Sequence, residues 1–221
     1  PGDKVIICTG DGIDYIVELR KFYNNENLCI GRIISKKRNQ NEPQVNISLA
    51  QAIPKDRNME LVAEKGTEMG IKNLIPLHTK RTVVKLKGNK KEKRIKRWQR
   101  KVEAAAKQSQ RGIIPEVTDI YNIEELSETL DNYDLILIFW TGETSLDINN
   151  IFRKNNLIQN DIKDILLMVG PEGGFTEKEV NRLAENPNTF SVTLGPRILR
   201  TETAGLAALS VILYEFGELG S

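Results

Sequence analysis

Two turns near the carboxyl end of the chain hold the residue types best suited to cradle a ligand. The first covers residues 170–175 and reads Gly-Pro-Glu-Gly-Gly-Phe, and the second covers residues 194–204 and reads Leu-Gly-Pro-Arg-Ile-Leu-Arg-Thr-Glu-Thr-Ala. Each follows a strand-like run and precedes a helix-like run. Because glycine has no Cβ, a ligand can approach the backbone closely at such turns. Together they predict one pocket, built mainly from backbone N–H and C=O groups at the carboxyl edge of a parallel sheet.

Several other kinds of site lack the residues that they need. Neither turn ends in Gly-Lys-Ser or Gly-Lys-Thr, as a phosphate-binding P-loop does, and neither contains Gly-x-Gly-x-x-Gly. His78 is the sole histidine, and the two cysteines, Cys8 and Cys29, fit no metal-ligand spacing. These counts disfavour zinc chemistry and a protease triad, so we expect no metal site. For either turn taken alone, a purely structural connection between strand and helix remains the alternative.

The two turns and their surroundings resemble a known family. The run over residues 167–179, Leu-Met-Val-Gly-Pro-Glu-Gly-Gly-Phe-Thr-Glu-Lys-Glu, and the second turn are similar to the bacterial 16S ribosomal RNA uridine-N3 methyltransferases of the SPOUT superfamily. The resemblance continues through residues 64–71, 75–77 and 103–109 and covers most of the chain. It implies S-adenosylmethionine as cofactor, 16S rRNA of the 30S subunit as substrate, and a homodimer that forms through a knotted domain.

The organisation of the chain agrees with that class. Strand-like runs in residues 1–53, the last of them at 45–52, predict a small antiparallel β unit, which the resemblance identifies as a PUA-like RNA-binding domain. Strand and helix alternate over residues 54–221 and predict an α/β domain with a mostly parallel sheet. The resemblance adds a C-terminal trefoil knot built from residues 139–145, 170–175 and 194–200. It also implies that the β domain is incomplete, because family members begin before the Pro-Gly-Asp that opens this chain.

The same resemblance implies which residues hold the cofactor. They lie in the two turns and in the knot segment at residues 139–145: Gly170, Pro171, Glu172, Gly173, Gly174, Leu194, Gly195, Ile198, Leu199, Arg200 and Thr141.

The expected reaction needs a group that stabilises negative charge. N3 of uridine carries a proton near neutral pH, and its loss spreads charge over O2, N3 and O4, which a guanidinium would stabilise. Arg200 is the first candidate because it lies in the cofactor turn, and Arg111 is the second. Glu202 or Glu172 is suited to accept the proton or to orient an arginine. Alternatively, Glu202 only favours the start of a helix and Glu172 only folds its loop.

Positive charge is concentrated in one stretch. Residues 55–111 hold 18 Lys and Arg against 6 Asp and Glu, whereas the rest of the chain holds 14 against 24. A helix is expected here, with its basic side chains on one stripe and Trp98 on the opposite, core-facing side. Such a face either tracks RNA phosphates or is an ordinary solvated surface. The predicted RNA-binding residues are Arg81, Lys93, Arg97, Arg100, Lys107, Gln108 and Arg111.

The last helix is apolar nearly all round from Ala204 to Leu213, so it must be buried on several sides, either within one chain or at a twofold interface. No apolar run is long enough to span a bilayer, and we expect a cytoplasmic protein. Three functions stay open: the uridine-N3 methyltransferase, a SPOUT enzyme that methylates a ribose 2′-hydroxyl, and a non-catalytic RNA-binding or ribosome-assembly factor.

Overall fold

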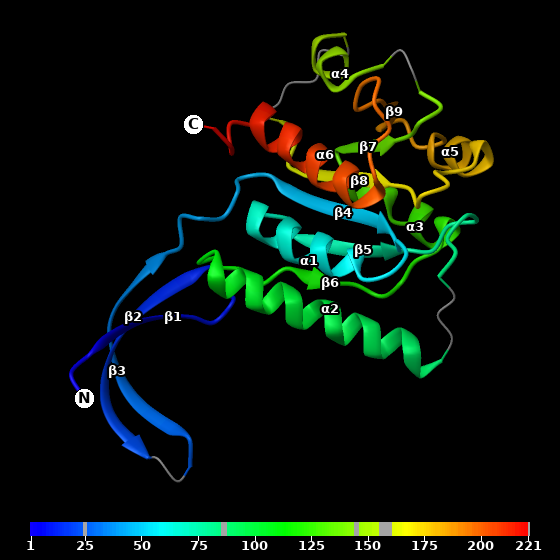
Figure 1. The fold of residues 1–221 in the computed structure, drawn as a ribbon. Coiled ribbons are helices and arrows are strands. Elements are labelled where there is room, and N and C mark those ends of the chain that lie inside the picture. The colour runs from blue at the N-terminus through cyan, green and yellow to red at the C-terminus, as the bar shows by residue number, and fades with distance from the viewer. Residues whose placement is uncertain (24–25, 85–87, 144–145, 155–160, 221) are drawn as a thin grey trace.

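The computed structural model describes residues 1–23, 26–84, 88–143, 146–154 and 161–220, which form two sheets and the helices that cover the larger one (Figure 1). The first sheet is antiparallel, in the order β1-β2-β3, with bounds Lys4–Cys8, Ile13–Tyr23 and Leu28–Arg38. The second sheet is parallel and contains β4 (Asn46–Ala52), β5 (Asn73–Leu77), β6 (Glu116–Val117), β7 (Leu135–Phe139), β8 (Asp164–Val169) and β9 (Thr189–Val192). The helices are α1 (Asn58–Met69), α2 (Asn89–Gln108), α3 (Ile123–Ser127), the 3-10 turn η1 (Leu130–Asn132), α4 (Ile148–Lys154), α5 (Glu177–Leu183) and α6 (Thr201–Glu215).

The parallel sheet has the order β6-β5-β4-β8-β7-β9, and every pairing between its neighbours is parallel. Its central strands are buried almost from end to end, as their runs of Leu, Ile and Val require when helices cover both faces. The predicted α/β class with a mostly parallel sheet is confirmed. Because all the strands run one way, the connections after β7, β8 and β9 start from the same edge.

Two hydrophobic cores lie on opposite faces of this sheet. On one face α1, α2, α4 and α6 pack around Leu49, Leu137 and Leu167. On the other face α3 and α5 pack around Ile136 and Met168. Figure 1 shows α6 lying along β4 and β8 on the first face. Its first turn therefore lies close to the carboxyl edge, where the loops gather.

One strand belongs to a different sheet from the one that the sequence predicted. Residues 45–52 were expected in the antiparallel unit, but β4 pairs in parallel with β5 and β8 at the centre of the larger sheet. That assignment is wrong. Burial explains the difference, because β3 is exposed along its whole length whereas β4 is buried from Ile47 to Ala52. A strand with apolar neighbours on both faces is stable only inside a covered sheet.

The helix starts near the site follow local rules. A capping box starts α5: Thr176 Oγ1 accepts from the Glu179 backbone N–H at 3.3 Å, and the Glu179 carboxylate accepts from the Thr176 N–H at 2.8 Å. Phe175 and Val180 are buried on either side of it. α6 begins at Thr201, within the second predicted turn, with Arg200 as its N-cap residue. The turns are thus held between regular elements and need no long loop.

Residues 1–45 form the small antiparallel sheet, which contacts the α/β part through the segment after α2. Gly12 N donates to Gly112 O at 3.0 Å, and the Asn39 side chain donates to Gln110 O at 3.2 Å. The PUA-like identity of this sheet and the trefoil knot stay predictions. In the part of the chain that the structure describes, no helix is both long and apolar enough to cross a membrane.

Candidate active site

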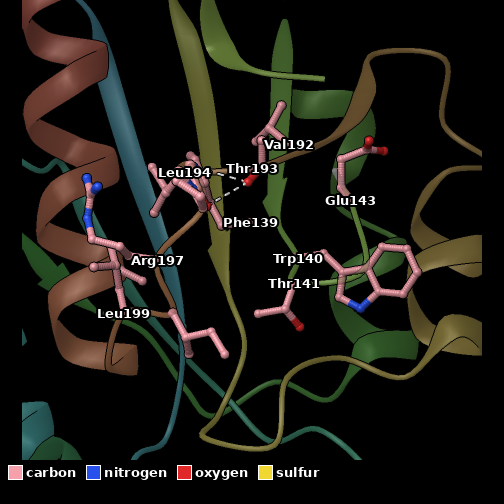
Figure 2. A pocket seen from close by; sticks show the side chains of 13 residues that line it. Phe139, Trp140, Thr141, Glu143, Val192, Thr193, Leu194, Arg197 and Leu199 are labelled. Atoms are coloured by element: carbon pink, nitrogen blue, oxygen red, sulfur yellow. Dashed lines mark hydrogen bonds between the residues drawn. The ribbon is translucent and has the colours of Figure 1, made fainter. Parts of the chain in front are cut away.

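A cavity of about 470 Å³ opens at the carboxyl edge between the segment after β7 and the turn after β9 (Figure 2). Trp140 and Thr141 lie on one side of it, and Leu194 and Leu199 lie on the other. Its lining is Phe139, Trp140, Thr141, Glu143, Val192, Thr193, Leu194, Gly195, Pro196, Arg197, Ile198, Leu199 and Ala204. The volume and the mostly apolar walls with a few polar groups suit a small organic ligand.

The second predicted turn forms one wall of this cavity. Gly195 has a φ of 98°, which glycine adopts without strain, and its N–H donates to Thr193 Oγ1 at 3.1 Å. The same hydroxyl donates to the Gly195 carbonyl at 3.3 Å (dashed in Figure 2). Ile198 is 89% exposed at the tip of the turn. The structure thus brings together five predicted cofactor residues: Thr141, Leu194, Gly195, Ile198 and Leu199.

The first predicted turn adjoins the cavity without being part of its lining. The turn closes through a bond from Gly174 N to Pro171 O at 2.8 Å, and Gly174 has a φ of 68°. A Cβ on Gly174 would lie 3.6 Å from Thr141 Oγ1, so the two segments are in contact range. A Cβ on Gly170 would lie 3.0 Å from the Phe175 backbone N, which leaves no room for a side chain. Residue 170 therefore has to be glycine because a side chain would not fit. Residue 174 has to be glycine because its φ is positive.

Side chains from other elements hold the first turn in place. Arg81 Nη1 donates to the carbonyls of Gly173, at 2.6 Å, and Phe175, at 3.4 Å. The Glu172 carboxylate accepts from the Lys55 backbone N–H at 2.9 Å. This contact favours the loop-folding alternative for Glu172 over proton transfer. Arg81 was predicted as an RNA contact, and its bonds to the turn are a role that the sequence did not indicate.

The catalytic candidates Arg200 and Glu202 lie together at the start of α6. Arg200 is exposed and directly follows Leu199, a lining residue of the cavity. Glu202 lies in the first turn of the helix and is 9% exposed. A guanidinium that faces solvent beside the cofactor turn can reach a bound base, and the nearly buried carboxylate two residues further along is a candidate to orient it.

Arg111 does not join this group, and its predicted catalytic and RNA-binding roles need correction. Its side chain lies beyond the end of α2 and the residue is 6% exposed. Nη1 donates to the carbonyls of Thr67 at 3.1 Å and Ile71 at 2.6 Å, and Nη2 pairs with Glu42 at 2.6 Å. With these donors engaged in the interior, the Arg111 side chain links α1, the end of α2 and the segment before β4, and it is not free to contact RNA.

The other predicted RNA-binding residues on α2 share an exposed face. Lys93, Arg97, Arg100, Lys107 and Gln108 are all exposed, whereas Trp98 is 2% exposed and packs in the core as expected. Arg97 pairs with Glu60 of α1 at 2.5 Å.

Charges on the neighbouring helix α1 largely satisfy one another. Lys65 bonds to Glu64 and Glu68, and its ammonium group lowers the pKa of the Glu64 carboxyl. Glu64 also pairs with Lys101 of α2 at 3.8 Å, so carboxylates of α1 offset part of the positive charge of α2.

Comparisons with known proteins agree with this site. The RNA methyltransferase domain family matches residues 40–213, which include both turns and all of the parallel sheet. Ribosomal RNA small subunit methyltransferase E of Bacillus subtilis is 35% identical over 216 residues, which cover 97% of this chain and 82% of that protein. The corresponding protein of Mesomycoplasma hyopneumoniae is 33% identical over 205 residues, 92% of this chain and 83% of its own length.

A solved structure of a related protein is also similar to this chain. Ribosomal RNA small subunit methyltransferase E of Neisseria gonorrhoeae, bound to S-adenosylmethionine, matches with a TM-score of 0.82 and 28% identity, over 97% of this chain and 84% of that one. The chain therefore belongs to the ribosomal RNA small subunit methyltransferase E family.

Proposed function

We propose that this protein transfers a methyl group from S-adenosylmethionine to N3 of a uridine in the 16S rRNA of the small ribosomal subunit. Its relatives are named for methylation of small-subunit rRNA, and the solved Neisseria gonorrhoeae protein is bound to S-adenosylmethionine. The observation that carries the proposal is the cavity, which both predicted turns adjoin and which Arg200 flanks. The 30S subunit as substrate would place the activity in the cytoplasm.

The residues present fit this cofactor. Apolar side chains such as Trp140, Leu194 and Leu199 can cover an aromatic base, while backbone groups and the Thr141 hydroxyl offer hydrogen bonds. The positive φ of Gly174 lets the first turn close tightly beside Thr141. When bound, S-adenosylmethionine supplies an electrophilic methyl group, so the protein has to supply position and charge. The proposed cofactor residues are those that the sequence indicated, with Trp140 added.

The residues that would act in the reaction itself lie at the start of α6. Arg200 would hold the uridine anion that forms when N3 loses its proton, and its guanidinium would face the O2 or O4 oxygen. Glu202 would orient Arg200 or take up the N3 proton. RNA would be positioned by the exposed basic face of α2, through phosphate contacts that carry no sequence information. We also propose a homodimer that packs through the outward face of α6.

The identity of the methylated nucleoside tests this function. Purified protein is incubated with labelled S-adenosylmethionine and unmodified 30S subunits, and nucleosides from the digested rRNA are identified by mass spectrometry. We expect the label in 3-methyluridine. Label in a 2′-O-methyl nucleoside would identify a ribose methyltransferase instead. RNA binding without any incorporated label would identify a non-catalytic factor.

A further inference from the structure

The buried side-chain amide of Gln51 lies at the point where the two turns meet the parallel sheet. Gln51 is the next-to-last residue of β4 and is 0% exposed. Its register partner in β8 is Val169, the residue directly before the first turn. Its hydrogen-bond partner is Thr201, the first residue of α6, which belongs to the second turn. The Gln51 side chain, in a central strand of the sheet, is therefore next to residues that belong to or adjoin both turns.

The hydrogen bonds form a directed chain. Thr201 Oγ1 donates to the Gly170 carbonyl at 2.5 Å, and a carbonyl can only accept. Since a hydroxyl has one proton, Thr201 must accept its second bond, and Gln51 Nε2 donates that bond at 2.8 Å. Nε2 also donates to Ala52 O at 3.2 Å. The direction of this chain fixes the orientation of the amide, with nitrogen toward Thr201.

The amide oxygen of Gln51 lowers the stability of the folded protein. Gln51 Oε1 is buried and has no hydrogen-bond partner among the residues that the structure describes. A Cβ on Gly205, one turn along α6, would lie 2.6 Å from this oxygen, so the glycine allows the helix to pack on the amide. An unpaired buried acceptor is unfavourable, and an apolar side chain of similar length would avoid that cost. Stability alone therefore does not explain a glutamine here.

We propose that Gln51 is a positioning residue for cofactor binding: by bonding Thr201, which in turn bonds Gly170, it holds the second turn in register with the first. The role rests on the proposed function, because the two turns must stand at a fixed separation only if one ligand contacts both. A backbone that is already in place binds its ligand without a reorganisation cost. Gln51 itself lies outside the lining of the cavity and acts through Thr201.

A double-mutant cycle tests this role in the full chain. Gln51→Met, Thr201→Val and the double variant are compared with wild type for the Kd of S-adenosylmethionine by calorimetry and for urea unfolding. Ser48→Ala is the control, because it removes a buried hydroxyl that accepts from Asn73 at the other end of the same strand. We expect each single variant to weaken binding about tenfold, as the loss of one buried hydrogen bond does. The double variant should bind no more weakly than Thr201→Val alone.

Stability gives the second readout. Gln51→Met should unfold at the same urea concentration as wild type or higher, because the unpaired oxygen is gone. Ser48→Ala should lower the urea midpoint and leave the Kd unchanged. A Gln51→Met protein that fails to fold, that binds as tightly as wild type, or whose loss multiplies with that of Thr201→Val would overturn the role of Gln51. If wild type itself binds no S-adenosylmethionine, the proposed function falls as well, so the two failures are distinguishable.

Discussion

The two arginines that the sequence offered as first and second catalytic candidates have opposite surroundings. Arg200 lies exposed at the N-cap of α6, beside the cavity. Arg111 is buried, with two carbonyls and the Glu42 carboxylate around its guanidinium. A buried guanidinium with satisfied donors stabilises structure, whereas an exposed one beside a pocket can act on a ligand. Each placement leads to a different expected effect of mutation.

Replacing Arg111 should affect stability first. Arg111→Ala removes the partner of Glu42 and one hydrogen-bond donor from each of the Thr67 and Ile71 carbonyls. Loss of one side of a buried ion pair typically costs about 3–5 kcal/mol, and we expect about 3 kcal/mol of unfolding free energy here because Glu42 is partly exposed. Urea unfolding measures it. Arg100→Ala, at an exposed position, should change stability by less than about 0.5 kcal/mol. Weaker RNA binding with unchanged stability would restore the RNA role of Arg111.

Replacing Arg200 should affect turnover first. Arg200→Ala would remove the group that stabilises charge in the transition state, and such a loss lowers kcat by about 100- to 1,000-fold. The KM for S-adenosylmethionine should change far less, because the cavity walls and the turn remain. Steady-state methylation of 30S subunits gives both constants. Arg197→Ala is the comparison, since Arg197 lines the cavity three residues earlier. A larger loss of kcat in Arg197→Ala would move the charge-stabilising role to that residue.

The sequence indicated the site residues that belong to local motifs and missed those that reach it from afar. The glycine turns and the Thr176 capping box were predictable, because backbone conformation is encoded by neighbouring residues. Gln51 lies 150 residues from Thr201, and Arg81 lies 92 residues from Gly173. Such partners come together only through the topology of the sheet, so no spacing in the sequence signals them.

Among the elements, the first turn is held from several directions. Thr201 bonds it from α6, Arg81 from the segment after β5, and the Lys55 N–H contacts it from the segment after β4. A loop fixed at separate points loses little entropy on binding a ligand. The turn is therefore expected to be ordered before the cofactor arrives.

Removing one of these contacts should loosen the turn without unfolding the protein. Arg81→Met keeps the length of the side chain but loses the bonds to Gly173 and Phe175. Amide hydrogen exchange in residues 171–175 should become faster, and the Kd for S-adenosylmethionine should rise about fivefold, the effect of roughly 1 kcal/mol. Lys80→Met is the control, because it removes a neighbouring positive charge and keeps the Lys80 backbone N–H that donates to Glu179. Equal exchange rates in both variants would contradict this role of Arg81.

The basic helix is expected to act through charge. Arg100→Ala with Lys107→Ala removes two exposed cations from the predicted RNA face of α2. The slope of log K against log salt concentration should become shallower by about 2, one unit for each lost phosphate contact. Filter binding to 16S rRNA over a salt series measures the slope. Lys163→Ala with Lys178→Ala removes the same charge away from α2 and should leave the slope unchanged. An equal change in both variants would mean that only net charge matters.

At the scale of the whole molecule, alternation of strands and helices predicted the α/β class but not the sheet to which each strand belongs. β4 follows the three antiparallel strands closely along the chain, so local pattern assigned it to them. Its position between β5 and β8 is decided by burial on both faces, which only the assembled molecule provides. This strand also carries Gln51, so the same error concealed a residue of the proposed site.

The last helix leads to a prediction about assembly. α6 buries Leu209, Ile212 and Leu213 within the chain, which accounts for one side of its apolar surface. Its outward side keeps Val211 and Tyr214 exposed, the latter at 67%. A helix with apolar residues on its solvent side is explained by a partner that covers them, and a twofold axis would pair the helix with its own copy.

A charge on that outward side should therefore separate the subunits. Tyr214→Glu would place two carboxylates in a desolvated, apolar interface, which is costly for association but harmless to a folded monomer. We expect sedimentation equilibrium to give a dimer for wild type and a monomer for the variant, with methylation falling in parallel if the dimer is the active form. Leu61→Glu, at an exposed apolar position of α1, should stay dimeric and active. A monomeric wild type with full activity would show that α6 needs no partner and that the pocket is complete in one chain.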